Sequence, residues 1–141
     1  MTSFEPPCDP LLLTAIAYAN KNHFDIANIV HTMFKDEFVC SNIKQSKWYV
    51  KDEQGEWVED ENARCLRIKM STDVVKMFCA VSSFHAQKAC FTEDETERER
   101  CSNISKRVLL LGSALKDHGF KNAIIKECCD LFFIKGFPQS T

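Results

Sequence analysis

A short stretch of β-type sequence interrupts a chain whose hydrophobic residues otherwise recur at helical spacing. Residues 38–40, 47–50 and 56–58 are rich in aromatic and β-branched side chains, and polar turns separate them. Residues 52–55, with the sequence Asp-Glu-Gln-Gly, have the composition of a tight hairpin turn whose glycine is left-handed. Three strands this short can form only a small sheet. The sequence therefore predicts an α+β fold, mainly helical, with a small antiparallel β-sheet inserted between helices.

Helical signals lie on both sides of these strands. Asp9 followed by Pro10 predicts a helix over residues 11–20, because aspartate is a favoured N-cap and proline suits the first helical position. Apolar residues at three- and four-residue steps predict a second helix over residues 24–34. A long helix is expected over residues 63–84, with an interruption at residues 71–73, where serine and aspartate favour caps over helix interiors.

The C-terminal third is also expected to be helical, over residues 104–115 and 121–133. Gly119 is interpreted as the stop signal of the first of these helices. The polar stretch 86–103 is either a mobile loop or an exposed helix. A length of 141 residues fits one domain, with residues 1–8 as an N-terminal arm, 9–138 as the folded body and 139–141 as a tail.

The net charge of −2 conceals an uneven distribution along the chain. Residues 51–61 and 93–99 are mostly acidic, whereas lysine and arginine outnumber acidic residues from position 104 onward. Any affinity for a polyanion should therefore lie in the C-terminal third, although an ordinary solvated surface explains the same pattern. The candidate nucleic-acid-binding residues are Lys106, Arg107, Lys121, Asn122 and Lys126.

Aromatic residues on the predicted hairpin offer a second kind of contact. Trp48 and Tyr49 could stack on nucleic-acid bases if their rings are exposed. Trp48 and Trp57 flank the turn, however, so packing in the core is the favoured interpretation of both tryptophans.

Eight cysteines and an N-terminus without a signal peptide favour a reducing, intracellular compartment over secretion. Cys65, Cys79 and Cys128 fall at apolar positions of predicted helices, where a cysteine acts as a small buried hydrophobic residue. Cys128 and Cys129 are adjacent and cannot both face one core, so one of them is expected to be exposed. A vicinal disulfide is the less favoured alternative for this pair.

The sequence contains few combinations that could carry catalysis. Cys79, His85, Cys90 and Cys101 have irregular spacing and no C-x-x-C pair occurs, so no metal site is predicted. The four glycines do not allow a phosphate-binding loop, a G-x-G-x-x-G motif or a G-x-S-x-G motif. We therefore expect neither enzymatic activity nor a cofactor for this chain. A Cys–His catalytic pair stays open, because such partners meet only in the fold.

Two stretches form a recognisable pair. The first is Phe34-Lys35-Asp36-Glu37-Phe38-Val39-Cys40, followed by the Trp48-Tyr49-Val50 strand and by Trp57 after the hairpin. The second is residues 120–128, with Phe132 and Phe137 beyond it. Over residues 22–138 the chain resembles the domain that precedes the superfamily 3 helicase core in poxvirus-type helicase–primases of large DNA viruses, phages and plasmids. Residues 79–103 match no part of that pattern, and residues 136–141 replace a segment that is often polar or charged in that family.

The resemblance implies a collar-like module over residues 9–138 that contacts adjacent primase and helicase domains. It also implies single- or double-stranded DNA as a partner, and a homo-oligomer that is a hexamer in the parent protein. ATP and Mg²⁺ would bind in the helicase domain of that parent, so none of the family's catalytic residues falls in this stretch, which looks like an excised piece. The implied location is inside a host cell, at a cytoplasmic replication site rather than in the nucleus, without secretion or a membrane partner.

The sequence therefore predicts a non-catalytic module of a viral-type DNA replication helicase–primase. Its expected role is in ring assembly, with DNA binding next to the ATPase as a further expectation. The alternative is a protein–protein interaction module that does not contact nucleic acid.

Overall fold

A computed structural model describes residues 5–137 of the chain. The mainly helical α+β fold with a small antiparallel sheet is confirmed, and the predicted tail at residues 139–141 lies outside the described residues. The helices are α1 (Pro10–Ala17), α2 (His23–Phe34), α3 (Arg64–Lys69), α4 (Val75–Phe91), α5 (Glu95–Ala114) and α6 (His118–Leu131), with a 3-10 segment η1 (Glu61–Ala63) and a π-helix η2 (Met70–Val74). The strands are β1 (Phe38–Asn42), β2 (Lys47–Lys51) and β3 (Trp57–Glu59).

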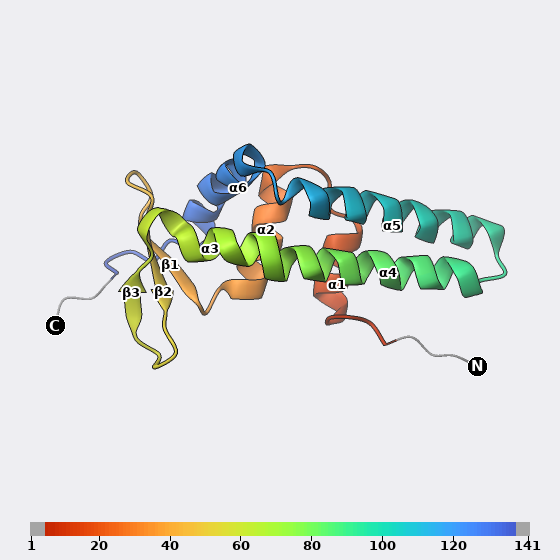
Figure 1. Cartoon of the computed structure of the whole chain (residues 1–141), viewed down its shortest axis with the longest axis horizontal. Helices are drawn as coiled ribbons and strands as arrows, with labels where there is room; N and C mark the ends of the chain where they lie inside the picture. The colour runs from red at the N-terminus through yellow and green to blue at the C-terminus, as the bar shows by residue number, and fades with distance from the viewer. Residues whose placement is uncertain (1–4, 138–141) are drawn as a thin grey trace.

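A long helical rod made of α3, η2 and α4 runs the length of the molecule (Figure 1). α5 returns alongside α4 in the opposite direction, and α1 and α2 cross this pair. The sheet lies at the α3 end of the rod, and α6 packs on α2 close to the sheet. Segments from both halves of the sequence therefore meet at the end of the molecule that carries the sheet.

The interruption expected at residues 71–73 is present as the π-turn η2, which separates α3 from α4 without ending the rod. The helix widens at this turn, in which Met70 and Val74 are fully buried. Thr72 donates through Oγ1 to the carbonyl of Ile68 at 2.7 Å. Thr72 is thus satisfied within the helix and Asp73 pairs with Lys69, whereas Ser71 accepts a hydrogen bond from Lys121 of α6. These polar residues mark an irregular turn rather than an end.

The polar stretch 86–103 is helical rather than a loop. α4 continues to Phe91, and α5 begins at Glu95 with Asp94 as its N-cap, where the carboxylate accepts from the Thr96 amide at 3.2 Å. Of the two alternatives drawn from the sequence, the exposed helix is correct. A helical hairpin needs only a narrow apolar seam, so a mostly polar composition does not prevent helix formation.

The boundary between α5 and α6 differs from the prediction. α6 begins at His118 rather than at residue 121, because the Asp117 carboxylate caps it by accepting from the Phe120 amide at 2.9 Å. Gly119 lies in the first turn of α6 and is not the stop signal of the preceding helix. An N-cap aspartate that sequence reasoning overlooked therefore decides this boundary.

The three strands form an antiparallel sheet in the order β1-β2-β3, with Val50 paired to both Phe38 and Val58. The predicted hairpin turn is confirmed, since Gly55 has a φ of 80°. At the other edge, the segment after α6 extends the sheet. The Cys40 amide donates to the Phe132 carbonyl at 3.0 Å, and the Ile134 amide donates to the Cys40 carbonyl at 3.1 Å.

Trp48 belongs to the core, as the favoured interpretation predicted. Its side chain is 1% exposed, and its ring packs edge-on against Phe132 with the centroids 5.4 Å apart. Trp57 is half-buried and packs against Phe137 with the centroids 5.3 Å apart. The two tryptophans therefore have different environments, and Phe132 and Phe137 attach the end of the chain to the sheet.

The cysteine predictions need correction. Cys65 and Cys79 are exposed although they lie in helices, and all eight cysteines are free thiols. Cys128 and Cys129 are both buried, at 0% and 3% exposed, where one was expected at the surface. The expectation was wrong because α6 lies against α2 and also reaches β1, so two neighbouring faces of this helix are covered.

Candidate nucleic-acid interface

The rod and α6 meet through polar contacts that involve two of the predicted site residues. Arg67 of α3 donates through Nη1 to Oδ1 of Asn122 on α6. Lys121 donates through Nζ to the hydroxyl of Ser71 in η2 at 2.7 Å. These two contacts bring basic side chains from separate parts of the sequence to one surface.

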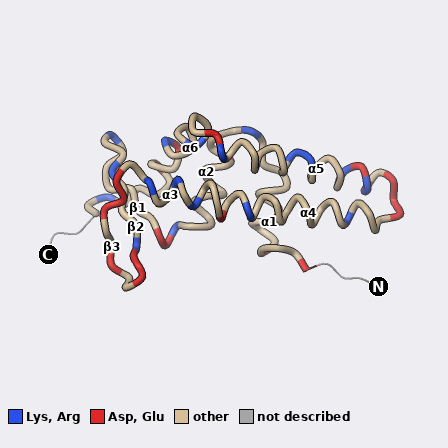
Figure 2. The backbone as a smooth tube through the Cα atoms, in the orientation of Figure 1, with Lys and Arg blue, Asp and Glu red and all other residues tan. Residues whose placement is uncertain are grey.

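Two exposed cations extend this surface at either side. Lys126 lies one helical turn beyond Asn122 on α6, and Arg64 lies one turn before Arg67 on α3. Figure 2 shows the blue cationic segments of α3 and α6 at the end of the molecule near the sheet. The set Arg64, Arg67, Lys121, Asn122 and Lys126 is called the basic surface below.

The cations of the basic surface are not paired with acids. Among the described residues, the ion pairs within 4.0 Å are Lys47–Glu59, Lys69–Asp73 and Arg100–Glu97. None of them includes a member of the basic surface. The side chains of Arg67 and Lys121 instead donate to neutral groups, namely the Asn62 carbonyl, Asn122 and Ser71. No ion pair within 4.0 Å neutralises these cations, although Glu59, Asp60 and Glu61 line a hollow beside Arg64 and Arg67. Cations without an ion-pair partner can attract a polyanion.

Arg107 has a different role from the one predicted. Its guanidinium donates through Nη2 to the Ala17 carbonyl at the end of α1, and its Nε is buried without a partner. A cation at this place satisfies a free carbonyl and the negative end of the helix dipole. Arg107 therefore fastens α1 to α5. Lys106 is exposed on α5, a helix that does not carry the basic surface.

The predicted stacking residues are only partly available. Trp48 is enclosed in the core, so its condition for stacking on bases, an exposed ring, is not met. Tyr49 is half-buried, with its ring 5.3 Å from that of Phe137 and with Lys47 Nζ 6.0 Å from its centroid. Trp48 and Tyr49 differ in exposure because alternate residues of a strand face opposite sides of the sheet.

Sequence reasoning missed Arg64 and Arg67. They follow directly after the acidic run 51–61, so charge counted along the chain assigned them to an acidic region. Their spacing of three residues on a helix was the available signal for a shared face. Contact with α6 comes only from the fold.

A hollow of about 580 Å³ lies beside Arg64 and Arg67, and Glu59, Asp60 and Asn62 line its other side. The Asp60 carboxylate is 3% exposed and accepts hydrogen bonds from the amides of Cys65 at 2.8 Å and Leu66 at 3.3 Å. Asp60 is thus occupied in capping α3. Three acidic residues, Glu59, Asp60 and Glu61, share this hollow with the two arginines, so it can bind charged groups of either sign.

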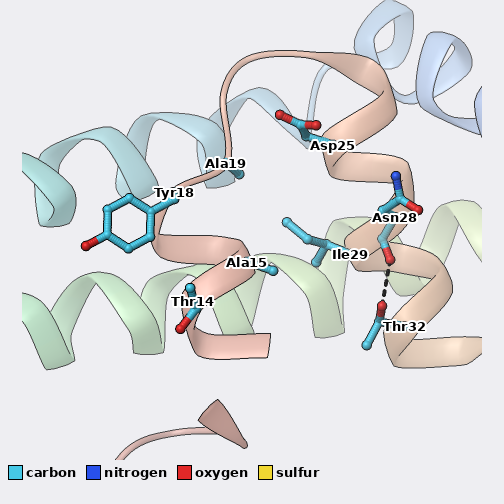
Figure 3. A pocket seen from close by; sticks show the side chains of 8 residues that line it. All are labelled: Thr14, Ala15, Tyr18, Ala19, Asp25, Asn28, Ile29 and Thr32. Atoms are coloured by element: carbon cyan, nitrogen blue, oxygen red, sulfur yellow. Dashed lines mark hydrogen bonds between the residues drawn. The ribbon is translucent and has the colours of Figure 1, made fainter. Parts of the chain in front are cut away.

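Figure 3 shows another hollow, of about 360 Å³, between α1 and α2. Asp25 is the one charged residue in its lining, and Thr32 hydrogen-bonds through Oγ1 to the Asn28 carbonyl at 2.9 Å instead of pointing its hydroxyl at a ligand. Tyr18 and Thr14 from α1 form the facing wall. No group of opposite charge converges there with Asp25, and we assign no ligand to it.

Within residues 5–137, no three side chains of the types histidine, cysteine, aspartate and glutamate gather closely enough to hold a metal ion. In the same part of the chain, no helix combines the length and the apolar character required to cross a membrane.

Residues 5–137 form a helix-rich α+β fold in which α3 and α6 carry neighbouring cations that form no ion pair within 4.0 Å. No family model matches the chain. It is similar to a protein of Acanthamoeba polyphaga mimivirus that is provisionally named a helicase, with 27% identity over 122 residues. The match covers 84% of this chain and 12% of the mimivirus protein, so the chain spans about an eighth of that relative. This similarity points to a domain related to a viral helicase.

Proposed function

We propose that this chain is a non-catalytic module of a viral-type DNA replication helicase–primase, and that its basic surface contacts the phosphate backbone of DNA. The observation that carries the proposal is the meeting of α3 and α6, where Arg67 contacts Asn122 and Lys121 contacts Ser71. Arg64 and Lys126 lie one helical turn away on the same two helices. Lysine, arginine and asparagine side chains are the usual donors to phosphate oxygens. The helicase name of the similar mimivirus protein supports the same assignment.

ATP hydrolysis and Mg²⁺ binding belong, in this proposal, to other parts of a longer protein. The module contributes contacts to neighbouring primase and helicase domains and to ring assembly, and it guides the DNA next to the ATPase. The phosphate contacts do not read sequence, so binding is expected for DNA of any base composition.

Fluorescence anisotropy of a labelled single-stranded oligonucleotide, titrated with the chain at several salt concentrations, tests the DNA contact. Affinity should fall steeply with salt, because each phosphate contact releases counterions. Replacing Lys121 and Lys126 with glutamate should weaken binding at least about tenfold and reduce the salt slope by roughly 0.7 per lost contact.

A matched control has the same change of charge elsewhere. Lys35 at the end of α2 and Lys88 near the far end of α4 lie on neither α3 nor α6. The Lys35→Glu, Lys88→Glu variant should keep most of the affinity if binding is local to the basic surface. Equal losses in the two variants would show a response to net charge alone and would contradict the proposed surface.

A second candidate function, protein interaction without nucleic-acid contact, is favoured by exposed leucines on α5. Leu109 and Leu110 are 51% and 73% exposed, although leucine is usually buried. Under this alternative the chain shows no salt-dependent DNA binding, and Leu109→Ser with Leu110→Ser abolishes association in sedimentation experiments. DNA binding that survives this double substitution would favour the first proposal.

A further inference from the structure

A buried pair of thiols joins the sheet to α6. Cys40 of β1 is fully buried and Cys129 of α6 is 3% exposed, and both belong to the same hydrophobic core. The two thiols are neighbours that influence one another, because Cys129, after burial itself, raises the pKa of Cys40. They belong to elements distant in sequence, so their contact is a property of the fold.

Backbone hydrogen bonds hold the two cysteines in place. Cys40 exchanges backbone hydrogen bonds with Phe132 and Ile134, at 3.0 and 3.1 Å, in a parallel bridge. Cys129 lies one turn before Phe132, at the end of α6. The bridge thus fixes the strand and the helix end at a constant spacing around the thiols.

A short exposed turn covers this pair. Ser46 lies in the β1–β2 turn with a φ of 50°, in the left-handed region that costs a non-glycine residue free energy. Its hydroxyl lies 3.5 Å from the Cys129 sulfur and accepts from Trp48 Nε1 at 3.3 Å. A strained surface turn is a segment that opens more readily than the helices and strands beneath it.

We propose that Cys40 and Cys129 form a modification site, an oxidisable dithiol that closes to a disulfide between β1 and α6 in the presence of a low-molecular-weight disulfide. One protein thiolate attacks the small disulfide, forms a mixed disulfide and releases one small thiol. The second protein thiolate then attacks the mixed disulfide and releases the other. The protein loses two electrons and two protons, and the small disulfide is reduced to two thiols.

Closure of the Ser46 turn slows this reaction. Burial, followed by the neighbouring Cys129, raises the pKa of Cys40 to about 12, so its reactive thiolate is scarce at neutral pH. Oxidation therefore proceeds through opening of the Ser46 turn. Once formed, the bond crosslinks distant positions and restricts the unfolded chain, so it should raise the melting temperature by at least about 5 °C.

The test starts from the full chain with Cys65, Cys79 and Cys90 changed to serine, which removes the three exposed thiols. The folded protein is equilibrated with oxidised and reduced glutathione, alkylated, digested with trypsin and analysed by mass spectrometry. The expected product joins peptide 36–44 to peptide 127–135, two hydrogens lighter than the separate peptides. Reduction should reverse both this linkage and the rise in melting temperature.

Cys128 supplies the matched control, because it lies in the same tryptic peptide but points its thiol at the Ala27 carbonyl of α2, 4.0 Å away. Cys128→Ser should keep the linkage, and Cys129→Ser should abolish it. A linkage that persists in Cys129→Ser would overturn the proposal. A linkage that forms only in urea would also overturn the proposal. So would the absence of the linkage in the folded starting protein at the highest ratio of oxidised to reduced glutathione. Both results can be read even if a serine variant fails to fold.

Discussion

Arg67 of α3 donates a hydrogen bond to Asn122 of α6 across 55 positions of sequence. Next to it, Lys121 reaches Ser71 of the π-turn. The asparagine neutralises no charge, so it orients the arginine while leaving it positive. The contact therefore serves both the packing of α6 on the rod and the electrostatics of the basic surface.

A double-mutant cycle measures this contact. Arg67→Ala and Asn122→Ala should each lower the free energy of unfolding. Either substitution alone removes their shared, partly buried hydrogen bond, so the coupling energy of the double variant should be about 0.5–1.5 kcal/mol. Urea denaturation of the four proteins gives the value. Strictly additive losses would mean that the two side chains do not interact in solution.

Trp48→Ala tests the core role of this tryptophan against base stacking. Removing a fully buried indole that packs on Phe132 should cost about 3–5 kcal/mol of unfolding free energy. Trp48→Phe retains an aromatic ring and should cost less, although it loses the hydrogen bond to Ser46. Thermal and urea unfolding of both variants provide the measurement.

A role of Trp48 in base stacking would give a different result from a role in the core. An alanine variant of unchanged stability that no longer binds DNA would show that the indole is used at the surface. Tyr49→Leu serves as the comparison, because Tyr49 is half-buried in the same strand.

Features that depend on a few neighbouring residues could be predicted from the sequence. The Asp9 cap, the Gly55 turn and the alternation around Trp48 each depend on residues within one strand, turn or helix start. The start of α6 also depends on local sequence, since Asp117 caps it. The prediction placed this start at residue 121 because it gave Gly119 more weight than the aspartate. Local signals were thus sufficient, but they competed with one another.

The candidate site could be predicted only in part, because its two halves meet through the fold. Lys121, Asn122 and Lys126 share α6 and were visible as a basic helix start. Arg67 reaches them from a helix that follows an acidic run, and Arg107 turns away to cap α1. No spacing rule carries information on which helices pack together, so these two arginines could not be assigned from charge alone.

Asp60 provides a test of the turn that leads into α3. Its carboxylate accepts from the amides of Cys65 and Leu66, and the following Asn62 and Ala63 have φ values of 57° and 54°. Asp60→Ala should lower the free energy of unfolding by about 1–3 kcal/mol, because two amides lose their acceptor in a strained segment.

Glu61→Gln is the control for this aspartate, since Glu61 is exposed and adjacent. It should change stability by no more than about 0.5 kcal/mol. Urea midpoints distinguish the two variants, and equal midpoints would show that the Asp60 carboxylate does not support the turn.

Stability should depend on pH through His85. Burial lowers the pKa of this histidine below its ordinary value of 6.5, against the opposing effect of its hydrogen bond to the Val81 carbonyl. The nearby cations Lys88, Arg100 and Arg107 lower it further. Between the folded-state pKa and 6.5 the unfolded chain binds more protons, so the free energy of unfolding rises with pH and falls on acidification.

Urea unfolding at closely spaced pH values through this interval measures the effect. Burial also lowers the pKa of His31, so His85→Gln should remove only part of the slope and the double variant with His31→Gln should remove more. His118→Gln, at an exposed position, is the control. A slope unchanged in His85→Gln would show that this histidine does not titrate between the two states.

Gly112 of α5 faces Phe78 of α4, and its replacement tests how tightly the hairpin is packed. A Cβ at this position would lie 3.3 Å from Cβ of Phe78, which is fully buried and has no free space into which to move. Alanine is the better helix former by about 1 kcal/mol, but overpacking against a fixed neighbour costs about 1–3 kcal/mol. Gly112→Ala should therefore destabilise the chain. Gly119→Ala, with a contact of 3.4 Å to the Asp117 carboxylate, should be neutral or stabilising, so equal gains in both variants would mean that α4 and α5 can separate at no cost.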